Sequence, residues 1–198
     1  MVTVCYTANM SSAKQPTLIS VADYLAGELV SEVKHEYING VVHAMTGGTN
    51  AHSMITANTM RCLGNLLEGS PCREYSSDAK VRVQTSSGTR FYYPDVQVVC
   101  KPNAQTDQFQ DSPVLIVEVL SPSTRRIDQG EKKDSYLSIG SLQIYVMLEQ
   151  QSPSATIYLR TDRGFECVVV EGPDAIIELE ALDVKLPLSA LYRDIVFE

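Results

Sequence analysis

An acidic side chain lies in the middle of the most apolar segment of the sequence. Glu118 follows the run VLIV (114–117) and precedes Val119 and Leu120. A run of this kind is typical of a central β-strand that is buried on both faces. A lone carboxylate is costly to bury unless it is ion-paired, hydrogen-bonded or bound to a metal ion. Glu118 is therefore the first residue for which the sequence predicts a chemical role.

A second carboxylate, Asp95, lies in the preceding β-like segment, FYYPDVQVVC (91–100). Side chains alternate along a strand, so Asp95 and Glu118 project to the same side if the two segments pair as neighbours. Two adjacent carboxylates raise each other's pKa, and a bound divalent cation removes that conflict. Ligands that are all oxygen favour Mg²⁺ or Mn²⁺ over zinc. We therefore expect Asp95 and Glu118 to be metal ligands.

The segment after Glu118 supplies a cation. Asp128, Lys132 and Tyr136 are spaced i, i+4 and i+8, so they line one face of a helix. A lysine beside a metal ion can orient a water molecule or stabilise charge on a phosphate. The neighbouring Lys133 shares its stripe with Leu137, which suits packing against the sheet. The pattern thus favours Lys132 for the cleft.

Each of these residues also has a purely structural interpretation. Asp95 follows Pro94 and can simply begin a strand at a turn. Glu118 can pair with a buried arginine. Lys132 can be a surface partner of Asp128, worth a few tenths of a kcal/mol. The sequence leaves these alternatives open.

The elements that must position these residues follow a mixed α/β pattern. We expect helices near 17–29, 52–67, 127–138 and 188–194. Strands are expected near 74–83, 91–100, 114–120 and 142–149, and a hairpin near 155–160 and 165–170. The chain shows no internal repeat, and the expected fold class is one mixed α/β domain.

A predicted hairpin near the N-terminus contains another acidic candidate, Glu36. Asn39-Gly40 between two β-rich runs is a strong signal for a two-residue turn. This turn predicts three cross-strand pairs, Ile38–Val41, Tyr37–Val42 and Glu36–His43. Glu36 is then either a cross-strand partner of His43 or an acid that binds metal or positions water.

Histidine gives no support for a hydrolase triad. No histidine lies near a candidate nucleophilic serine or cysteine in the sequence. His52 lies on the apolar stripe of the helix expected at 52–67, where a histidine is more often a hydrogen-bonded core residue. We therefore leave His52 outside the predicted catalytic set.

Length and charge narrow the class of protein. The 198 residues suit one domain, expected at 16–198 after a mobile leader at 1–15. No apolar run approaches the roughly 20 residues that span a bilayer, so no membrane partner is expected. The net charge of −8 disfavours a passive nucleic-acid binder. A local basic patch at 121–133, with Arg125, Arg126, Lys132 and Lys133, remains compatible with an enzyme.

Cysteine usage points to a reducing compartment. There are five cysteines, an odd number, and no C-x-x-C pair. This pattern predicts small buried thiols rather than disulfides or a zinc site. Free thiols suit a cytoplasmic location.

Several blocks of sequence together resemble a known family. Y-P-D (93–95) is followed by V-E-V-L-S-P-S-T (117–124) and then by D-x-x-x-K-x-x-x-Y (128–136). E-Y-I-N-G (36–40) and His52 lie upstream, and L-Q-I-Y-V-M-L (142–148) lies downstream. Over most of residues 17–195 the chain resembles the Uma-two family of bacterial restriction endonucleases, within the PD-(D/E)XK nuclease superfamily.

The resemblance implies a fold and a set of site residues. The implied fold is a restriction-endonuclease-like α/β core with a mixed central β-sheet flanked by helices. By position, Asp95 and Glu118 match the metal-binding acids, and Glu36 matches the upstream acid. The E-x-K motif reads Glu118-Val119-Leu120 here, so the usual strand lysine is missing. The family's lysine is moved to the next helix, at Lys132 in this chain.

Two functions follow as hypotheses. The first is a Mg²⁺- or Mn²⁺-dependent endonuclease that hydrolyses DNA, with Glu36, Asp95, Glu118 and Lys132 as catalytic residues. Because nucleases that cut duplexes often work as dimers, a homodimer is expected by analogy of fold. The second is a catalytically inactive nuclease fold that binds DNA or a protein, which the missing strand lysine and the acidic charge favour. Convergence of Asp95, Glu118 and Lys132 on one cleft would favour catalysis.

Overall fold

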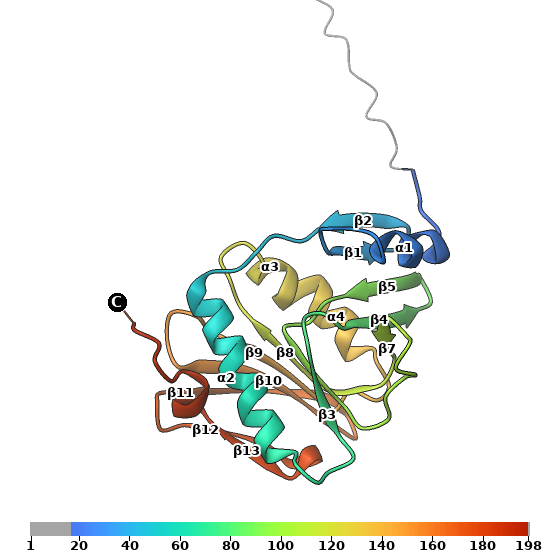
Figure 1. Cartoon of the computed structure of the whole chain (residues 1–198). Helices are drawn as coiled ribbons and strands as arrows, with labels where there is room; N and C mark the ends of the chain where they lie inside the picture. Colours follow the sequence, from blue (N-terminus) through green and yellow to red (C-terminus); the bar gives the residue numbers. More distant parts are fainter. Residues whose placement is uncertain (1–16, 198) are drawn as a thin grey trace, which may run out of the picture.

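The structure is a computed structural model that describes residues 17–197 (Figure 1). The leader predicted at 1–15 lies outside the described residues. In chain order the elements are α1 (Val21–Glu28), β1 (His35–Ile38), β2 (Val41–Ala44), α2 (Asn50–Leu66), β3 (Arg73–Ser76), β4 (Lys80–Thr85), β5 (Gly88–Tyr92), β6 (Val96–Val99), β7 (Phe109–Gln110), β8 (Pro113–Val119), α3 (Arg125–Ile127), η1 (Asp128–Lys132), α4 (Lys133–Leu137), β9 (Ile144–Leu148), β10 (Ser154–Thr161), β11 (Gly164–Glu171), β12 (Ile176–Leu179), η2 (Glu180–Leu182), β13 (Val184–Pro187) and α5 (Leu188–Leu191).

The strands form two large sheets and one small one. The order is β2-β1-β5-β4-β7 in the first, β11-β10-β9-β8-β6-β3 in the second, and β12-β13 in the third. The central strands β8 and β9 are parallel, whereas β6 and β8 are antiparallel. The six-stranded sheet is therefore mixed and flanked by helices, as the sequence predicts.

Helices pack on both faces of the six-stranded sheet (Figure 1). On one face, Ile55 and Leu63 of α2 join a core with Val117 and Val119 of β8. On the other face, Tyr136 of α4 belongs to a core shared with both large sheets. That second core includes Val81 and Val83 of β4 together with Ile116, Leu120, Tyr145 and Met147. The segment from α3 to α4 thus lies between the two large sheets.

The predicted hairpin is confirmed with its register. Glu36 pairs with His43, Tyr37 with Val42 and Ile38 with Val41. Asn39 and Gly40 both have positive φ, 51° and 97°, as a two-residue turn of this hand requires. Because this register is fixed, Glu36 is placed on a known face of the first sheet.

Two predicted strands are each two strands in the structure. The segment 74–83 is broken by a turn in which Ala79 N donates to Ser76 O, and β3 and β4 join different sheets. The segment 91–100 is broken at Tyr93–Asp95, where Pro94 has no N–H to give to a ladder. The short strands β7, β12 and β13 were not expected from the sequence. Polar or turn-forming residues mark both breaks, Ser77-Asp78 in the first and Pro94-Asp95 in the second, but the β-like residues on either side led to one continuous strand being predicted in each case.

The helix predicted at 127–138 is real but irregular. It contains a π-helical turn, η1, at Asp128–Lys132, between the short helices α3 and α4. Gly130 lies inside this turn. Single π-helical turns are rare and are often found at functional sites.

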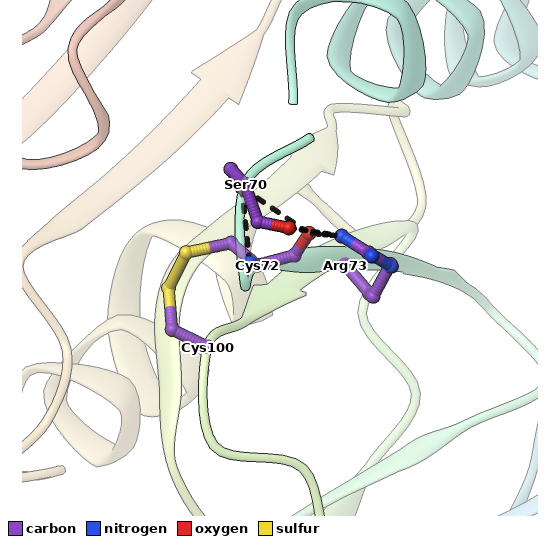
Figure 2. The surroundings of a disulfide bond; sticks show 4 residues. All are labelled: Ser70, Cys72, Arg73 and Cys100. Carbon is purple, nitrogen blue, oxygen red and sulfur yellow. Dashed lines mark hydrogen bonds between the residues drawn. A yellow bond between two sulfur atoms is a disulfide. The ribbon is translucent and has the colours of Figure 1, made fainter. Parts of the chain in front are cut away.

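The prediction that the thiols are free is wrong for one pair. Cys72 and Cys100 form a disulfide across a sequence separation of 28 residues (Figure 2). They lie directly beyond the paired ends of β3 and β6, where Arg73 is aligned with Val99. Among residues 17–197, Cys62 and Cys167 are free, and Cys167 is exposed rather than buried. The pairing could not be read from spacing because it depends on which strands become neighbours.

Candidate active site

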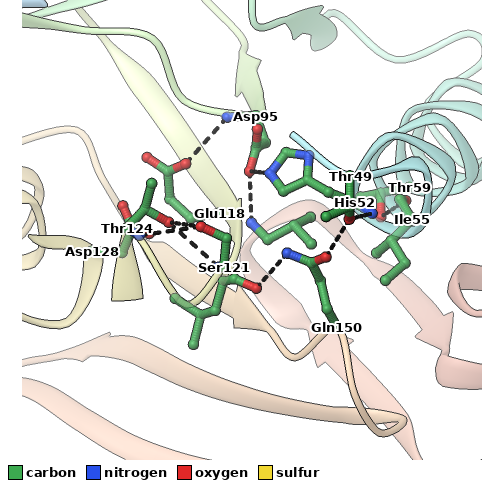
Figure 3. A network of polar contacts seen from close by, with 12 residues as sticks. Thr49, His52, Ile55, Thr59, Asp95, Glu118, Ser121, Thr124, Asp128 and Gln150 are labelled. Atoms are coloured by element: carbon green, nitrogen blue, oxygen red, sulfur yellow. Dashed lines mark hydrogen bonds and ion pairs between the residues drawn. The ribbon is translucent and has the colours of Figure 1, made fainter. Parts of the chain in front are cut away.

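The pairing of β6 with β8 brings the two predicted metal ligands together. Val96 is aligned with Val117 in an antiparallel register, so Asp95 and Glu118 occupy the next positions. The backbone N–H of Asp95 donates to Glu118 Oε2 over 3.4 Å, and the backbone N–H of Val119 donates to Asp95 Oδ2 over 2.7 Å. Figure 3 shows the Asp95 and Glu118 side chains at this junction of the two strands.

His52 belongs to this site, contrary to the prediction that it is a core residue. Its Nε2 lies 3.1 Å from Asp95 Oδ2 (Figure 3). Thr49 caps α2 by accepting a hydrogen bond from the backbone N–H of His52, which places the ring in the first turn of the helix. The hydrogen bond with Asp95 raises the pKa of His52. Only its position upstream in the family-like pattern could have signalled this.

Lys132 is the electrostatic centre of the site. Only 6% of the residue is exposed. Its Nζ lies 2.9 Å from Glu36 Oε1, 3.2 Å from Glu118 Oε1 and 3.6 Å from Asp128 Oδ1. Burial on its own lowers the pKa of Lys132, but the three carboxylates outweigh it and hold that pKa well above the usual value. The lysine is therefore charged at neutral pH.

This ammonium group connects the two large sheets. Glu36 comes from β1 of the five-stranded sheet, and Glu118 comes from β8 of the six-stranded sheet. Lys132 itself lies on η1, between them. For Glu36 Oε1, the ammonium is the one close partner among the described residues. All four predicted site residues, Glu36, Asp95, Glu118 and Lys132, are thus brought together.

Glu118 is held by a cation and a phenol. Tyr136 donates its hydroxyl to Glu118 Oε1 over 2.9 Å, beside the contact with Lys132. Only 3% of Glu118 is exposed, and this burial raises its pKa well above the usual value. Lys132 opposes the rise, whereas Asp128 and the other nearby acids add to it. The site therefore carries more acid than its own cation can compensate.

The structural alternatives for these residues can now be judged. The cation beside Glu118 is Lys132, not an arginine. Lys132 is buried and contacts Asp128 inside the cleft rather than at the surface. Glu36 is aligned with His43 across the hairpin, but its ion pair is with Lys132.

The predicted basic patch at 121–133 is not a continuous surface. Lys132 is buried among acids, and Arg125 forms an ion pair with Glu149. Lys133 lies 3.5 Å from Asp134 and 5.7 Å from the centre of the Tyr158 ring. This confirms that Lys133 points away from the cleft, and it leaves Arg126 as the exposed cation of that segment.

The site opens into a cleft of about 250 Å³. Its walls are the loop at 45–49, the loop at 121–124 and the first turn of α2, and its polar floor is formed by Asp95, Glu118, Asp128 and Lys132. Asp128 was predicted only as a member of the helix stripe. It is buried, which raises its pKa, and its Oδ1 accepts no hydrogen bond among the described residues. Asp128 therefore adds another carboxylate to the floor, whose Oδ1 faces Lys132 at 3.6 Å without accepting a hydrogen bond from it.

The carboxylates fit a small hard cation. Glu118 Oε2 receives only the long contact from Asp95 N, and Asp95 Oδ1 has no hydrogen bond within residues 17–197. No group of three or more acidic, histidine or cysteine side chains in that range is arranged to enclose a metal ion. Mg²⁺ commonly binds through one or two carboxylates and keeps water or phosphate as its other ligands. The donor set of Asp95 and Glu118 is of that kind, and the excess negative charge favours it.

Comparison with known proteins identifies relatives over nearly the whole chain. The profile of the Uma2 family, described as "Putative restriction endonuclease", matches residues 21–189. An uncharacterized protein of Synechocystis sp. (strain ATCC 27184 / PCC 6803 / Kazusa) is 32% identical over 191 residues, covering 96% of this chain and 99% of the relative. A second uncharacterized protein of that organism is 28% identical over 171 residues, which cover 84% of this chain and 96% of the relative.

A solved structure shares the fold. A crystal structure described as "a putative nuclease belonging to DUF820", from Anabaena variabilis ATCC 29413, is similar with a TM-score of 0.66 and 17% identity. The match covers 84% of this chain and 93% of that chain. At this identity the likeness shows a common fold, and it confirms the predicted fold class. Within residues 17–197, no helix is both long and apolar enough to cross a membrane.

Proposed function

Because the chain belongs to the Uma2 family of restriction-endonuclease-like proteins, we propose that it is a metal-dependent endonuclease that hydrolyses DNA phosphodiester bonds. The observation that carries the proposal is the convergence of Asp95, Glu118 and the buried Lys132 on one cleft. A charge cluster that served stability alone would gain little, because buried ion pairs are often no better than apolar packing. Because a cleft opens onto these charged side chains, a substrate can reach them, which favours a catalytic role.

In this proposal Asp95 and Glu118 hold Mg²⁺ or Mn²⁺. Such an ion, when bound, polarises the scissile phosphate and lowers the pKa of a water molecule. Asp95 is fixed for this role by the backbone N–H of Val119 and by His52, which share its Oδ2. His52 is thus a positioning residue that leaves the second oxygen of Asp95 available.

Lys132 acts on the phosphate or the attacking water rather than on the metal. Its ammonium reaches Glu118 Oε1 at 3.2 Å, so it lies beside the carboxylate and donates hydrogen bonds at the cleft floor. A charged donor held in a largely water-free site stabilises developing negative charge at little reorganisation cost. Glu36 and Tyr136 position Lys132 and Glu118, respectively.

The missing strand lysine does not weaken this assignment. Leu120 stands where the usual motif has lysine, and it is buried in the core between the two sheets. The ammonium of Lys132 comes from the helix side to the same glutamate. The contact supports the idea that the cation has moved in sequence while remaining beside Glu118.

The test is a cleavage assay on linear, supercoiled and branched DNA with Mg²⁺, Mn²⁺ or EDTA. The proposal predicts cleavage of at least one substrate with either metal and none with EDTA. Asp95→Asn should lose the activity, whereas Asp111→Asn, which removes an acid paired with Arg82 away from the cleft, should keep it. Metal-independent DNA binding without cleavage on all substrates would favour the inactive-module hypothesis instead.

A further inference from the structure

Among the described residues, β11 is an edge strand of the six-stranded sheet with no partner on its outer side. It stands at the end of the strand order, and its eight residues pair with β10 in one continuous register from Ser154–Glu171 to Thr161–Gly164. No bulge interrupts this pairing. The opposite edge, β3, has four residues and packs against α2. The long edge is therefore the open one.

Within residues 164–171 this edge contains neither lysine nor proline, and its pairing with β10 has no bulge. Sheet edges in monomeric proteins are commonly blocked by lysine, proline, a bulge or a covering element. Between Gly164 and Glu171, β11 has a single charged residue, Glu166. Cys167 is exposed, Val168 is 41% exposed and Val169 is 55% exposed. A largely apolar, exposed and uninterrupted edge of this length is suited to pairing with another strand.

The backbone hydrogen bonds define which residues face outward. Thr161 and Gly164 close a two-residue turn, so they form a hydrogen-bonded pair, and such pairs alternate along the ladder. Two neighbouring hydrogen bonds agree with this pattern. Arg160 N donates to Gln143 O on the β9 side of β10, and Gly172 N donates to Pro153 O on the β10–β11 side. The residues of β11 whose N–H and C=O groups point outward are therefore Phe165, Cys167, Val169 and Glu171.

These outward groups are self-complementary about a two-fold axis. An antiparallel second copy must align outward residues with outward residues to form hydrogen bonds. Centring the axis on Cys167 aligns Cys167 with Cys167 of the second copy and Phe165 with Val169 of the second copy. Closed two-fold dimers use one patch on both copies in this way.

The same register also matches charges. It brings Arg163, the second residue of the β10–β11 turn, opposite Glu171 of the second copy, and the two-fold axis repeats this pair. Both residues are exposed, and neither has an ion-pair partner within residues 17–197. If the second strand is shifted by two residues in either direction, Arg163 no longer lies opposite Glu171 of the second copy. The register centred on Cys167 is therefore favoured over its neighbours.

We infer that the chain forms a two-fold dimer in which β11 pairs with β11 of a second copy, joining two six-stranded sheets into one. The occupant of the edge is a second copy because hydrogen-bond parity, apolar contacts and charge all fit the strand to itself. The inference does not depend on nuclease activity, since β11 contributes no residue to the cleft.

The first test is the mass of the full chain in solution, by light scattering and sedimentation over a range of concentrations. The wild type should be dimeric at high concentration. Val169→Pro should be monomeric, because it removes an outward N–H while leaving the β10 pairing intact, and Val169→Lys should also be monomeric. Val169→Thr keeps the N–H and should remain dimeric. Circular dichroism checks that each variant is folded.

The second test is the register, by mild oxidation and non-reducing electrophoresis. Cys167 should give a disulfide-linked dimer, and Cys167→Ser should not. Asp162→Cys in the Cys167→Ser background is an exposed control whose two copies would lie about 33 Å apart in this register, so it should stay monomeric. A monomeric wild type at every concentration, a dimer that survives Val169→Pro, or equal cross-linking of the control would each overturn the inference.

Discussion

The two ends of strand β6 are held in opposite ways. Beyond its last residue, Cys100 is bonded covalently to Cys72, across from β3 (Figure 2). Before its first residue, Asp95 is held by hydrogen bonds and charge, through Val119 N and His52 (Figure 3). At one end the two cysteines are joined covalently and do not titrate, and at the other several acids gather around a single lysine.

Stability and function depend on opposite ends of β6. A disulfide stabilises mainly by restricting the unfolded chain, so its loss should lower stability without touching the cleft. The end of β6 that carries Asp95, called the charged end below, is costly to assemble. Glu118 and Asp128 are buried there and their pKa values are raised. We therefore expect changes at the two ends to separate the free energy of unfolding from catalytic activity.

The largest effect is expected from breaking the charged end at its centre. Lys132→Ala leaves three carboxylates without their cation and should cost roughly 3–5 kcal/mol of unfolding free energy. It should also abolish DNA cleavage, while the stabilisation by Mn²⁺ remains, because lysine is not a metal ligand. Urea unfolding with and without Mn²⁺, together with a cleavage assay, measures both.

Lys133→Ala is the matched control for Lys132. It removes a neighbouring cation that faces Asp134 and Tyr158, so cleavage should persist with at most a weaker, less salt-sensitive DNA affinity. If Lys133→Ala abolishes cleavage while Lys132→Ala keeps it, the assignment of the helix face is wrong.

Removing the Cys72–Cys100 disulfide should lower the free energy of unfolding and leave cleavage activity unchanged. The double change Cys72→Ser and Cys100→Ser opens a loop of 28 residues and should cost roughly 3–4 kcal/mol by loop entropy. Below the unfolding transition, the specific activity should equal that of the wild type. Cys62→Ser, at a half-buried free thiol, is the control. Lost cleavage in a double variant that is still folded would show that the two ends are coupled.

The next largest effect tests whether Glu118 is a metal ligand. Mn²⁺ at about 100 times its Kd should stabilise the wild type by roughly 2.7 kcal/mol. Glu118→Gln should remove this stabilisation, because it removes a ligand. Glu28→Gln replaces a half-buried acid away from the cleft, one bonded to Tyr93 and His35, and should leave the Mn²⁺ effect unchanged. An equal shift in Glu118→Gln would refute the metal assignment.

The smallest effect is a pH dependence of stability without metal. Glu118 and Asp128 have pKa values raised above 4.5 and 3.8, so the folded chain binds their protons more tightly than the unfolded chain. This contribution to stability is present below the unfolded values and is lost as pH rises through the folded values. In EDTA, the unfolding free energy of the wild type should therefore fall more with rising pH than that of Glu118→Gln. A steeper fall in the variant would contradict the raised pKa of Glu118.

Features that depend on interactions within one element or between two paired strands could be predicted from the sequence. The register around Asn39-Gly40 follows from turn geometry, and strand alternation put Asp95 and Glu118 on one side. The family-like D-x-x-x-K-x-x-x-Y pattern and the position of Leu137 favoured Lys132 over Lys133, although the real segment contains a π-helical turn. In each case the relevant neighbours lie within one element or across one pair of strands.

The rest of the site depends on packing between distant elements. His52 meets Asp95 only because α2 lies against the sheet that carries β6. Lys132 meets both Glu36 and Glu118 because its segment lies between the two sheets. The disulfide likewise required knowing that β3 and β6 are neighbours. None of these contacts has a signature in a single stretch of sequence.

The most direct measurement is the Mn²⁺-dependent cleavage of supercoiled DNA by the wild type, Glu118→Gln and the Cys72→Ser, Cys100→Ser variant, side by side at a temperature where all three are folded. If Glu118 binds the metal ion, the wild type and the cysteine variant should cleave the DNA, Glu118→Gln should not, and none of them should cleave it in EDTA. Cleavage by Glu118→Gln at the wild-type rate would contradict this role of Glu118.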